Sequence, residues 1–179
     1  YPYDPDEAER LVEESGHAGV EITLQTPIGR YLGDVEIAQA AANQIDSLSN
    51  VSCELEQREF SSLVQDITTG NIEDKPHFNL LGWGNGEFDG SQTITPLMTS
   101  DGALTIMKNE ELDGLIADAE AATDPDERVD ILQEANQLAH DLAPWVFLHQ
   151  QFSVYGVSND ISWEPRSDEF IDPDTATQQ

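Results

Sequence analysis

The sequence predicts an α/β fold with a mixed, partly parallel sheet that carries helices on its faces. Two observations support this. Residues 20–26 and 51–57 alternate between apolar and polar side chains, which is typical of half-buried strands. Residues 35–48, between them, place apolar side chains at helical spacing. A strand, helix and strand in this order favour parallel strands joined by a right-handed crossover helix.

The chain begins with a predicted helix over 4–15. Asp4 suits the N-cap, Pro5 the first helical position, and Glu7 completes a capping box. Gly16 then favours the end of the helix. The first strand follows within a few residues.

The middle of the chain continues the same alternation. Asp34 is the expected N-cap of the crossover helix, and Ser61 the expected N-cap of a short helix that Gly70 ends. The apolar run 78–83 predicts a buried strand. Residues 84–106 are rich in Gly and Thr, and we expect them to be irregular.

Two helices and an apolar segment are predicted in the last part. Asn109 starts the first helix, and Asp124 starts a longer one that Pro144 stops. Residues 145–157 are aromatic and β-branched, which predicts one or two strands. Residues 164–179 are polar and contain prolines, so we expect a loose tail.

Charge excludes several classes of function. The 179 residues include 36 Asp and Glu but 7 Lys and Arg, for a formal net charge of −29. Binding to nucleic acid or to an anionic membrane needs clustered basic residues, which are absent. The acidic residues alternate with periodic apolar ones, which favours a folded protein over disorder. High carboxylate content with two lysines favours a halophilic source; an ordinary acidic protein is the alternative.

Cys53 is the single cysteine, which excludes an intramolecular disulfide and a cysteine-rich metal site. It falls on the apolar side of its strand, so we expect a small core residue. No apolar run approaches the roughly 20 residues of a membrane span. The chain shows no secretory signal and does not start with Met, so we expect an internal piece of a longer protein.

Motifs for catalysis and metal binding are missing from the sequence. It has no G-x-S-x-G, P-loop, H-E-x-x-H or G-x-G-x-x-G pattern. Four histidines show no ligand spacing: His17, His77, His140 and His149. We therefore expect no catalytic residue, no bound metal and no cofactor.

One candidate binding loop, 26–31, follows the first strand. Ligands of open α/β sheets bind at the carboxyl ends of strands. Arg30 lies in this loop, and its guanidinium could pair with a ligand carboxylate through two hydrogen bonds. The alternative is an arginine that pairs with one of the many local acids.

The second candidate loop, 82–89, follows the predicted strand over 78–83. Its glycines would allow the backbone to approach a ligand closely. Trp83 and Phe88 could form the walls of an apolar pocket, with polar contacts from Asn85 and Asp89. The alternative is a turn with aromatic side chains packed beneath it.

An ordered set of segments resembles the C-terminal part of family 5 extracellular solute-binding proteins of dipeptide, oligopeptide and nickel ABC transporters, with haloarchaeal members most similar. The resemblance covers residues 1 to about 165. Its segments include Tyr3-Asp4-Pro5-Asp6-Glu7-Ala8, Asp34-Val35-Glu36-Ile37-Ala38-Gln39, Leu81-Gly82-Trp83, Asn109-Glu110-Glu111-Leu112-Asp113 and Ala143-Pro144-Trp145-Val146-Phe147-Leu148.

The resemblance implies a receptor rather than an enzyme, with one lobe of a type II periplasmic-binding-protein-like fold over 1–163 and a tail over 164–179. Such receptors lie outside the cell, anchored to its surface as lipoproteins. They capture a peptide or other small ligand by closure of two lobes and deliver it to a membrane permease. The N-terminal lobe of the protein would be missing here.

The resemblance also implies roles for residues. An arginine in the loop matching 26–31 binds the ligand carboxylate, which fits Arg30. An aspartate after the Gly-Trp element holds the peptide amine; 85–87 contains none, so Glu87 or Asp89 would substitute. The predicted ligand-binding residues are Arg30, Tyr31, Trp83, Asn85, Glu87 and Asp89.

Two other classes of function remain open. One is an acidic interaction domain without a small ligand. The other is an α/β hydrolase that uses Asp89 or Glu87 with His149. Loss of ligand binding in an Arg30→Ala variant would favour the receptor, whereas turnover that an Asp89→Asn variant abolishes would favour the hydrolase.

Overall fold

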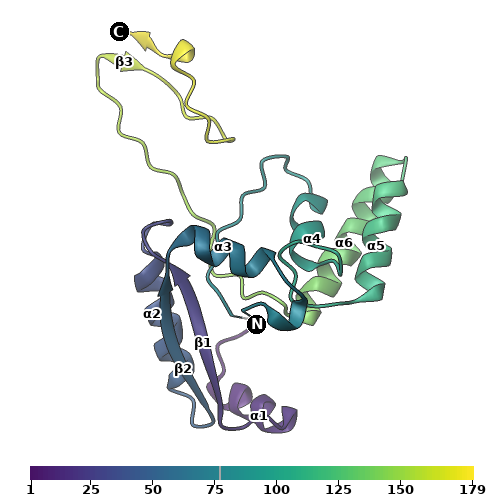
Figure 1. The fold of residues 1–179 in the computed structure, drawn as a ribbon. Coiled ribbons are helices and arrows are strands. Elements are labelled where there is room, and N and C mark those ends of the chain that lie inside the picture. The colour runs from purple at the N-terminus through teal and green to yellow at the C-terminus, as the bar shows by residue number, and fades with distance from the viewer. Residues whose placement is uncertain (77) are drawn as a thin grey trace. The chain divides into compact units, whose positions relative to one another are not determined.

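A computed structural model of the protein describes residues 1–76 and 78–179 (Figure 1). His77, one of the four histidines considered above, lies outside the described residues. The chain divides into two compact units, Tyr1–Pro144 and Trp145–Gln179. This division differs from the predicted boundary between 163 and 164, because residues of the expected tail pair with residues before it.

Helix α1 (Pro5–Ser15) confirms the predicted start of the chain. The Asp4 carboxylate accepts a hydrogen bond from the Glu7 backbone N–H at 3.0 Å, which satisfies a donor that the helix itself leaves unpaired. At the other end Gly16 has a φ of 78°. This left-handed conformation carries little strain in glycine and closes the helix.

Two parallel strands and one helix form the predicted crossover unit. Strands β1 (Val20–Pro27) and β2 (Val51–Arg58) pair in register from Val20 with Val51 to Pro27 with Arg58. Helix α2 (Asp34–Asp46) connects them and lies along the pair in Figure 1. The core between helix and sheet consists of Leu24, Ala38 and Ala42, with Cys53 and Leu55 packed against it.

The predicted strand over 78–83 is wrong in extent. Within the described residues, this segment meets the sheet through a single bridge between Gln25 and Asn79. The Gln25 N–H donates to the Phe78 carbonyl at 3.0 Å, and the Leu80 N–H donates to the Gln25 carbonyl at 2.8 Å. Gly82 follows directly, and glycine weakens a strand because it has no side chain to pack.

Helix α3 (Phe60–Thr68) begins two residues earlier than predicted, and its cap is different. The Glu59 carboxylate accepts the Ser62 backbone N–H at 3.1 Å, so Glu59 is the N-cap in place of Ser61. Ser61 instead donates its hydroxyl proton to Glu59. A short 3-10 turn, η1 (Ile72–Asp74), comes after α3.

Helix α4 (Ser91–Met98) lies in the stretch predicted to be irregular. Its sequence, Ser-Gln-Thr-Ile-Thr-Pro-Leu-Met, has low helix propensity and contains Pro96. Ile94, Leu97 and Met98 are nevertheless buried, and the helix packs against the last two helices of this unit. Burial of these apolar side chains therefore overrides weak local propensity.

Helices α5 (Glu110–Ala121) and α6 (Pro125–Leu142) pack against each other, as the side-by-side ribbons of Figure 1 show. Both begin at the predicted caps: Asn109 accepts the Leu112 N–H at 2.9 Å, and Asp124 accepts the Asp126 N–H at 2.9 Å. The buried side chains of this pair are Leu112, Ile116, Ala119, Ala135 and Ala139.

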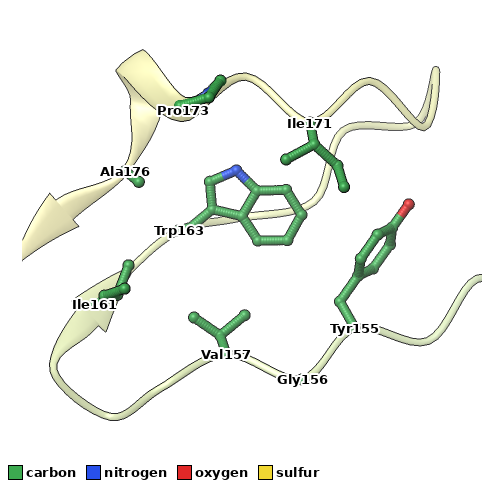
Figure 2. Close-up of a pocket in the computed structure, with 8 residues that line it drawn as sticks. All are labelled: Tyr155, Gly156, Val157, Ile161, Trp163, Ile171, Pro173 and Ala176. Atoms are coloured by element: carbon green, nitrogen blue, oxygen red, sulfur yellow. The ribbon is translucent and has the colours of Figure 1, made fainter.

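The second unit is built from short elements. Strand β3 (Ile161–Ser162) pairs antiparallel with β4 (Thr177–Gln178), and the 3-10 turn η2 (Pro173–Thr175) precedes β4. Figure 2 shows Tyr155, Trp163 and Ile171 around one apolar pocket, with the first two rings edge to face at 5.3 Å. The expected loose tail thus returns to the segment before it.

The strands predicted over 145–157 are wrong. No residue of that range is in a strand, and Phe147, Phe152 and Val154 are exposed. An apolar, β-branched sequence forms a strand only where a neighbouring strand pairs with its backbone. Among the helices of the described residues, none is both long and apolar enough to cross a membrane.

Candidate functional site

The loop after β1 is fixed by a buried carboxylate. Asp34, at the start of α2, accepts hydrogen bonds from the backbone N–H groups of Arg30 at 2.8 Å, Tyr31 at 3.0 Å and Val35 at 2.9 Å. Burial alone raises the pKa of Asp34, but these N–H groups outweigh it and lower the pKa below its ordinary value. Asp34 is therefore ionised at neutral pH, and its carboxylate fixes the backbone of the loop at Arg30 and Tyr31.

Arg30 extends from this loop over two aromatic rings. Its guanidinium carbon lies 4.9 Å from the centre of the Phe60 ring and 5.2 Å from that of Tyr31. The two rings are edge to face, with centres 6.2 Å apart. Both distances are within the range of cation–π attraction, which orients the guanidinium without using its N–H donors.

Arg30 differs from the other arginines in its partners. Arg10, Arg58, Arg128 and Arg166 each form an ion pair with a carboxylate. In the described part of the chain, Arg30 forms no ion pair and its guanidinium no hydrogen bond. In a protein of net charge −29, this leaves a cation whose donors are open to an anion from outside.

The two candidate loops meet at Tyr31. Its hydroxyl donates to the Gly82 carbonyl at 3.3 Å. A Cβ atom at position 82 would lie 2.6 Å from Cε1 of Tyr31, closer than real Cβ atoms come, so the approach requires glycine. Trp83 follows directly and is 42% exposed. The structure thus brings Arg30 and Tyr31 to the start of the second loop.

The 82–89 loop is closed by its own polar groups. Asn85 donates from Nδ2 to the Asp89 carbonyl at 2.8 Å, and its Oδ1 accepts the Asp89 N–H at 3.2 Å. The Glu87 N–H donates to Oε1 of Gln92 at 2.8 Å. Asn85 therefore builds the turn, with both ends of its amide in use.

Phe88 lies in that turn with a φ of 56°, and the residue is 73% exposed. A left-handed backbone is uncommon for a residue other than glycine and must be held by its surroundings. The Glu87 side chain is exposed and, among the described residues, no hydrogen bond holds it. Glu87 thus offers a carboxylate to solvent.

Asp89 forms hydrogen bonds with a residue of α6 and a residue of α4. Its carboxylate accepts Nη1 of Arg128 at 2.6 Å and Nη2 at 3.1 Å, as well as the Ser91 N–H at 2.9 Å and the Ser91 hydroxyl at 2.6 Å. The hydrogen bonds from Arg128, then those from Ser91, hold the pKa of Asp89 well below its usual range. This carboxylate is ionised and internally paired.

Sequence reasoning missed three residues of this arrangement. Asp34 was expected as the N-cap of α2, but the N-cap is Gly33; the bonds of Asp34 to the Arg30 loop were not expected. Phe60 had a usable signal, because it follows β2 by two residues and parallel strands end at the same edge. Arg128 had none, since 39 positions separate it from Asp89.

No group of three or more His, Cys, Asp or Glu side chains able to hold a metal ion occurs in residues 1–76 and 78–179. His149, proposed above as a hydrolase partner of Asp89 or Glu87, lies in the second unit, whereas both acids lie in the first.

No family model matches the chain. Among curated proteins it is similar to heme-binding protein A of Haemophilus influenzae, at 24% identity over 159 residues, and to di/tripeptide-binding protein 4 of Pseudomonas aeruginosa, at 25% over 153 residues. Each alignment covers 82% of this chain but 27% and 28% of the relative. The chain thus spans less than a third of the length of these relatives.

Three solved structures share the fold. The oligopeptide-binding protein AppA of Bacillus subtilis, in complex with a nonapeptide, has a TM-score of 0.74 over 100% of this chain and 40% of its own, at 17% identity. The periplasmic binding protein DppA of Helicobacter pylori, in complex with peptide STSA, has a TM-score of 0.65 and 20% sequence identity. The match covers 82% of this chain and 28% of DppA. NikA of Staphylococcus aureus, in complex with Ni(L-His)2, has a TM-score of 0.66 and 19% sequence identity. The match covers 79% of this chain and 30% of NikA.

The chain has the fold of part of a type II periplasmic binding protein. The expected fold class is confirmed, including the parallel pair with its crossover helix. The relatives are solute-binding proteins for heme, di- and tripeptides, oligopeptides or nickel. The resemblance seen in the sequence is confirmed at this level.

Proposed function

We propose that this chain is one part of the solute-binding component of an ABC importer and binds a peptide or a similar small solute. The observation that carries the proposal is the Arg30 guanidinium, which is oriented over Phe60 and Tyr31 and has no carboxylate partner. A cation kept free in so acidic a chain suits the carboxylate of a ligand. The binding proteins among the relatives support the same class.

The proposed mechanism is capture rather than chemistry. The chain supplies one lobe, and an N-terminal lobe of the same protein closes over the ligand before a membrane permease receives it. The short coverage of the relatives supports a further lobe. Exposed apolar residues of the second unit support a surface that this lobe covers: Val146, Phe147, Phe152, Val154 and Phe170.

The proposed setting is the outer face of the cell membrane, where a lipid anchor holds the receptor at the surface. The net charge of −29 with two lysines supports a halophilic source, because molar salt screens the repulsion between carboxylates. The resemblance to haloarchaeal members points to the same source.

The proposed roles of the site residues follow from their partners. Arg30 pairs with the ligand carboxylate, while Tyr31 and Trp83 offer aromatic surface beside it. Glu87 is the carboxylate of the second loop that remains available for a ligand amine. Asn85 and Asp89 act indirectly, since their polar groups maintain the turn.

A titration of the intact protein tests this function. Isothermal calorimetry in molar KCl would use Ala-Ala and Ala-Ala-Ala, and, as other ligand classes of the relatives, heme and Ni(II) with L-histidine. We expect a peptide to bind. Arg30→Ala should weaken that binding about ten- to hundredfold, the value of a charge-assisted pair, without lowering the melting temperature.

The matched control is Arg10→Ala, which removes an arginine from the exposed face of α1. It should bind as the unmodified protein does. The proposal is wrong if none of the peptides binds, or if the two arginine variants bind a peptide equally well.

A further inference from the structure

We infer that Arg128 is a positioning residue of the binding site: from the first turn of α6 it fixes the 82–89 loop through Asp89. The inference rests on the proposed function. It adds to the site a residue that acts through Asp89 rather than on the ligand itself.

The contact between Arg128 and Asp89 has two hydrogen bonds. Nη1 of Arg128 donates to Oδ2 at 2.6 Å, and Nη2 donates to Oδ1 at 3.1 Å. Nη2 also lies 3.3 Å from the Ser91 hydroxyl oxygen. Both side chains are about two-thirds covered, at 27% and 33% exposure. This fork geometry fixes direction as well as distance, which a single-point ion pair does not.

These partners use most of the acceptor capacity of the Asp89 carboxylate. It accepts two hydrogen bonds from Arg128 and two from Ser91, and a carboxylate has about four acceptor sites. Asp89, at the end of the loop, therefore connects the loop to Arg128 of α6 and to Ser91 at the start of α4. Its Oδ1 accepts three of these bonds and its Oδ2 one, so the protein itself takes up most of its acceptor capacity.

The backbone of Asp89 carries this constraint into the loop. Its carbonyl and N–H both bond to the Asn85 amide, at 2.8 and 3.2 Å, which closes the turn from 85 to 89. Phe88 lies inside the turn with its φ of 56°. A turn that holds such a residue needs a fixed end, because the strained conformation relaxes if the end moves.

The start of α6, which carries Arg128, is fixed by its own cap and by packing. Arg128 lies within the first turn of α6, whose N-cap Asp124 accepts the N–H groups of Asp126 at 2.9 Å and Glu127 at 3.2 Å. The same helix packs on α5 through buried Ala135 and Ala139. The loop is thus held at Gly82 by Tyr31 and at Asp89 by Arg128, with a further bond from the Glu87 N–H to Gln92.

Hydrogen exchange on the intact protein, without ligand, tests the positioning. In Arg128→Met, we expect the backbone amides of Glu87, Asp89 and Ser91 to exchange at least tenfold faster. Amides of β1 and β2 should keep their protection. Arg128→Lys, which keeps the charge but loses the fork, should fall between the two. Arg10→Met, which breaks an exposed ion pair on α1, is the control and should leave the loop unchanged.

Binding of Ala-Ala-Ala is then measured on the same proteins. We expect Arg128→Met to weaken it about tenfold and Arg128→Lys less. The inference is overturned if exchange rises evenly across the unit, which would indicate a general loss of stability, or if a loosened loop binds the tripeptide unchanged. If the unmodified protein binds no peptide while exchange rises in the loop alone, the proposed function fails but Arg128 still positions the loop.

Discussion

Single residues explain most of the shape of the candidate site. Asp34 closes the Arg30 loop, Gly82 admits the Tyr31 ring, and Arg128 holds Asp89. Arg30 could be singled out in the sequence because it is a rare arginine at a strand end. Its aromatic partners and the pairing of Asp89 depend on contacts between distant segments, and a single sequence carries no signal for those.

A methyl group at position 82 should disturb the site. In Gly82→Ala, Cβ would lie 2.6 Å from the Tyr31 ring, so the ring must shift away from the Gly82 carbonyl and from Phe60. We expect a loss of about 1–3 kcal/mol in unfolding free energy and weaker peptide binding. Urea unfolding and calorimetry measure these.

Gly84→Ala is the matched control, because a Cβ there meets no atom within 4 Å. It should leave the free energy of unfolding close to that of the unmodified protein. Equal losses of unfolding free energy in the two variants would contradict the close approach of Tyr31.

Asp34 should make folding sensitive to acid. Its pKa is lower in the folded protein than in the unfolded chain, so the ionised form stabilises the fold. That stability is present above the unfolded pKa of about 3.9 and is lost as pH falls through the folded value. We expect Asp34→Asn to cost about 1–3 kcal/mol at pH 7 and to cost less below pH 4.

Urea unfolding of both proteins between pH 2 and 7 measures this difference. Many other carboxylates titrate in the same range, but subtraction of the two curves isolates Asp34. A cost that stays constant across the range would show that the charge of Asp34 contributes nothing.

Elements with strong local patterns were predictable, and those set by tertiary contacts were not. Helix α1, strands β1 and β2, and helices α5 and α6 follow caps and periodicity that lie within a few residues. Helix α4 forms despite Pro96, because its apolar side chains are buried. The apolar segment 145–157 had the composition of a strand but forms no strand in the structure.

The caps of α1 and α6 provide a test at this scale. Asp4→Ala and Asp124→Ala each remove a carboxylate that accepts backbone N–H groups at a helix start. Each should cost about 1 kcal/mol. Only Asp124→Ala should speed exchange in the 82–89 loop, because α6 carries Arg128. Exchange in the loop that responds to both caps alike would contradict the link.

At the scale of the whole molecule, charge dominates. The 36 acidic residues repel one another, and salt screens them over about 10 Å at 0.1 M and 3 Å at 1 M. We expect the melting temperature to rise steadily from 0.1 to 2 M KCl. Calorimetric scans at matched pH measure it; a flat or falling series would argue against adaptation to salt.

The unpaired guanidinium of Arg30 also bears on how quickly a ligand arrives. A carboxylate ligand that approaches from a distance meets the field of the whole protein, which is strongly negative. It meets the attraction of Arg30 only near contact, above the Phe60 and Tyr31 rings. For a ligand of net negative charge, we therefore expect encounter to be slowest in dilute buffer and faster in molar salt, the reverse of receptors whose overall charge attracts their ligand.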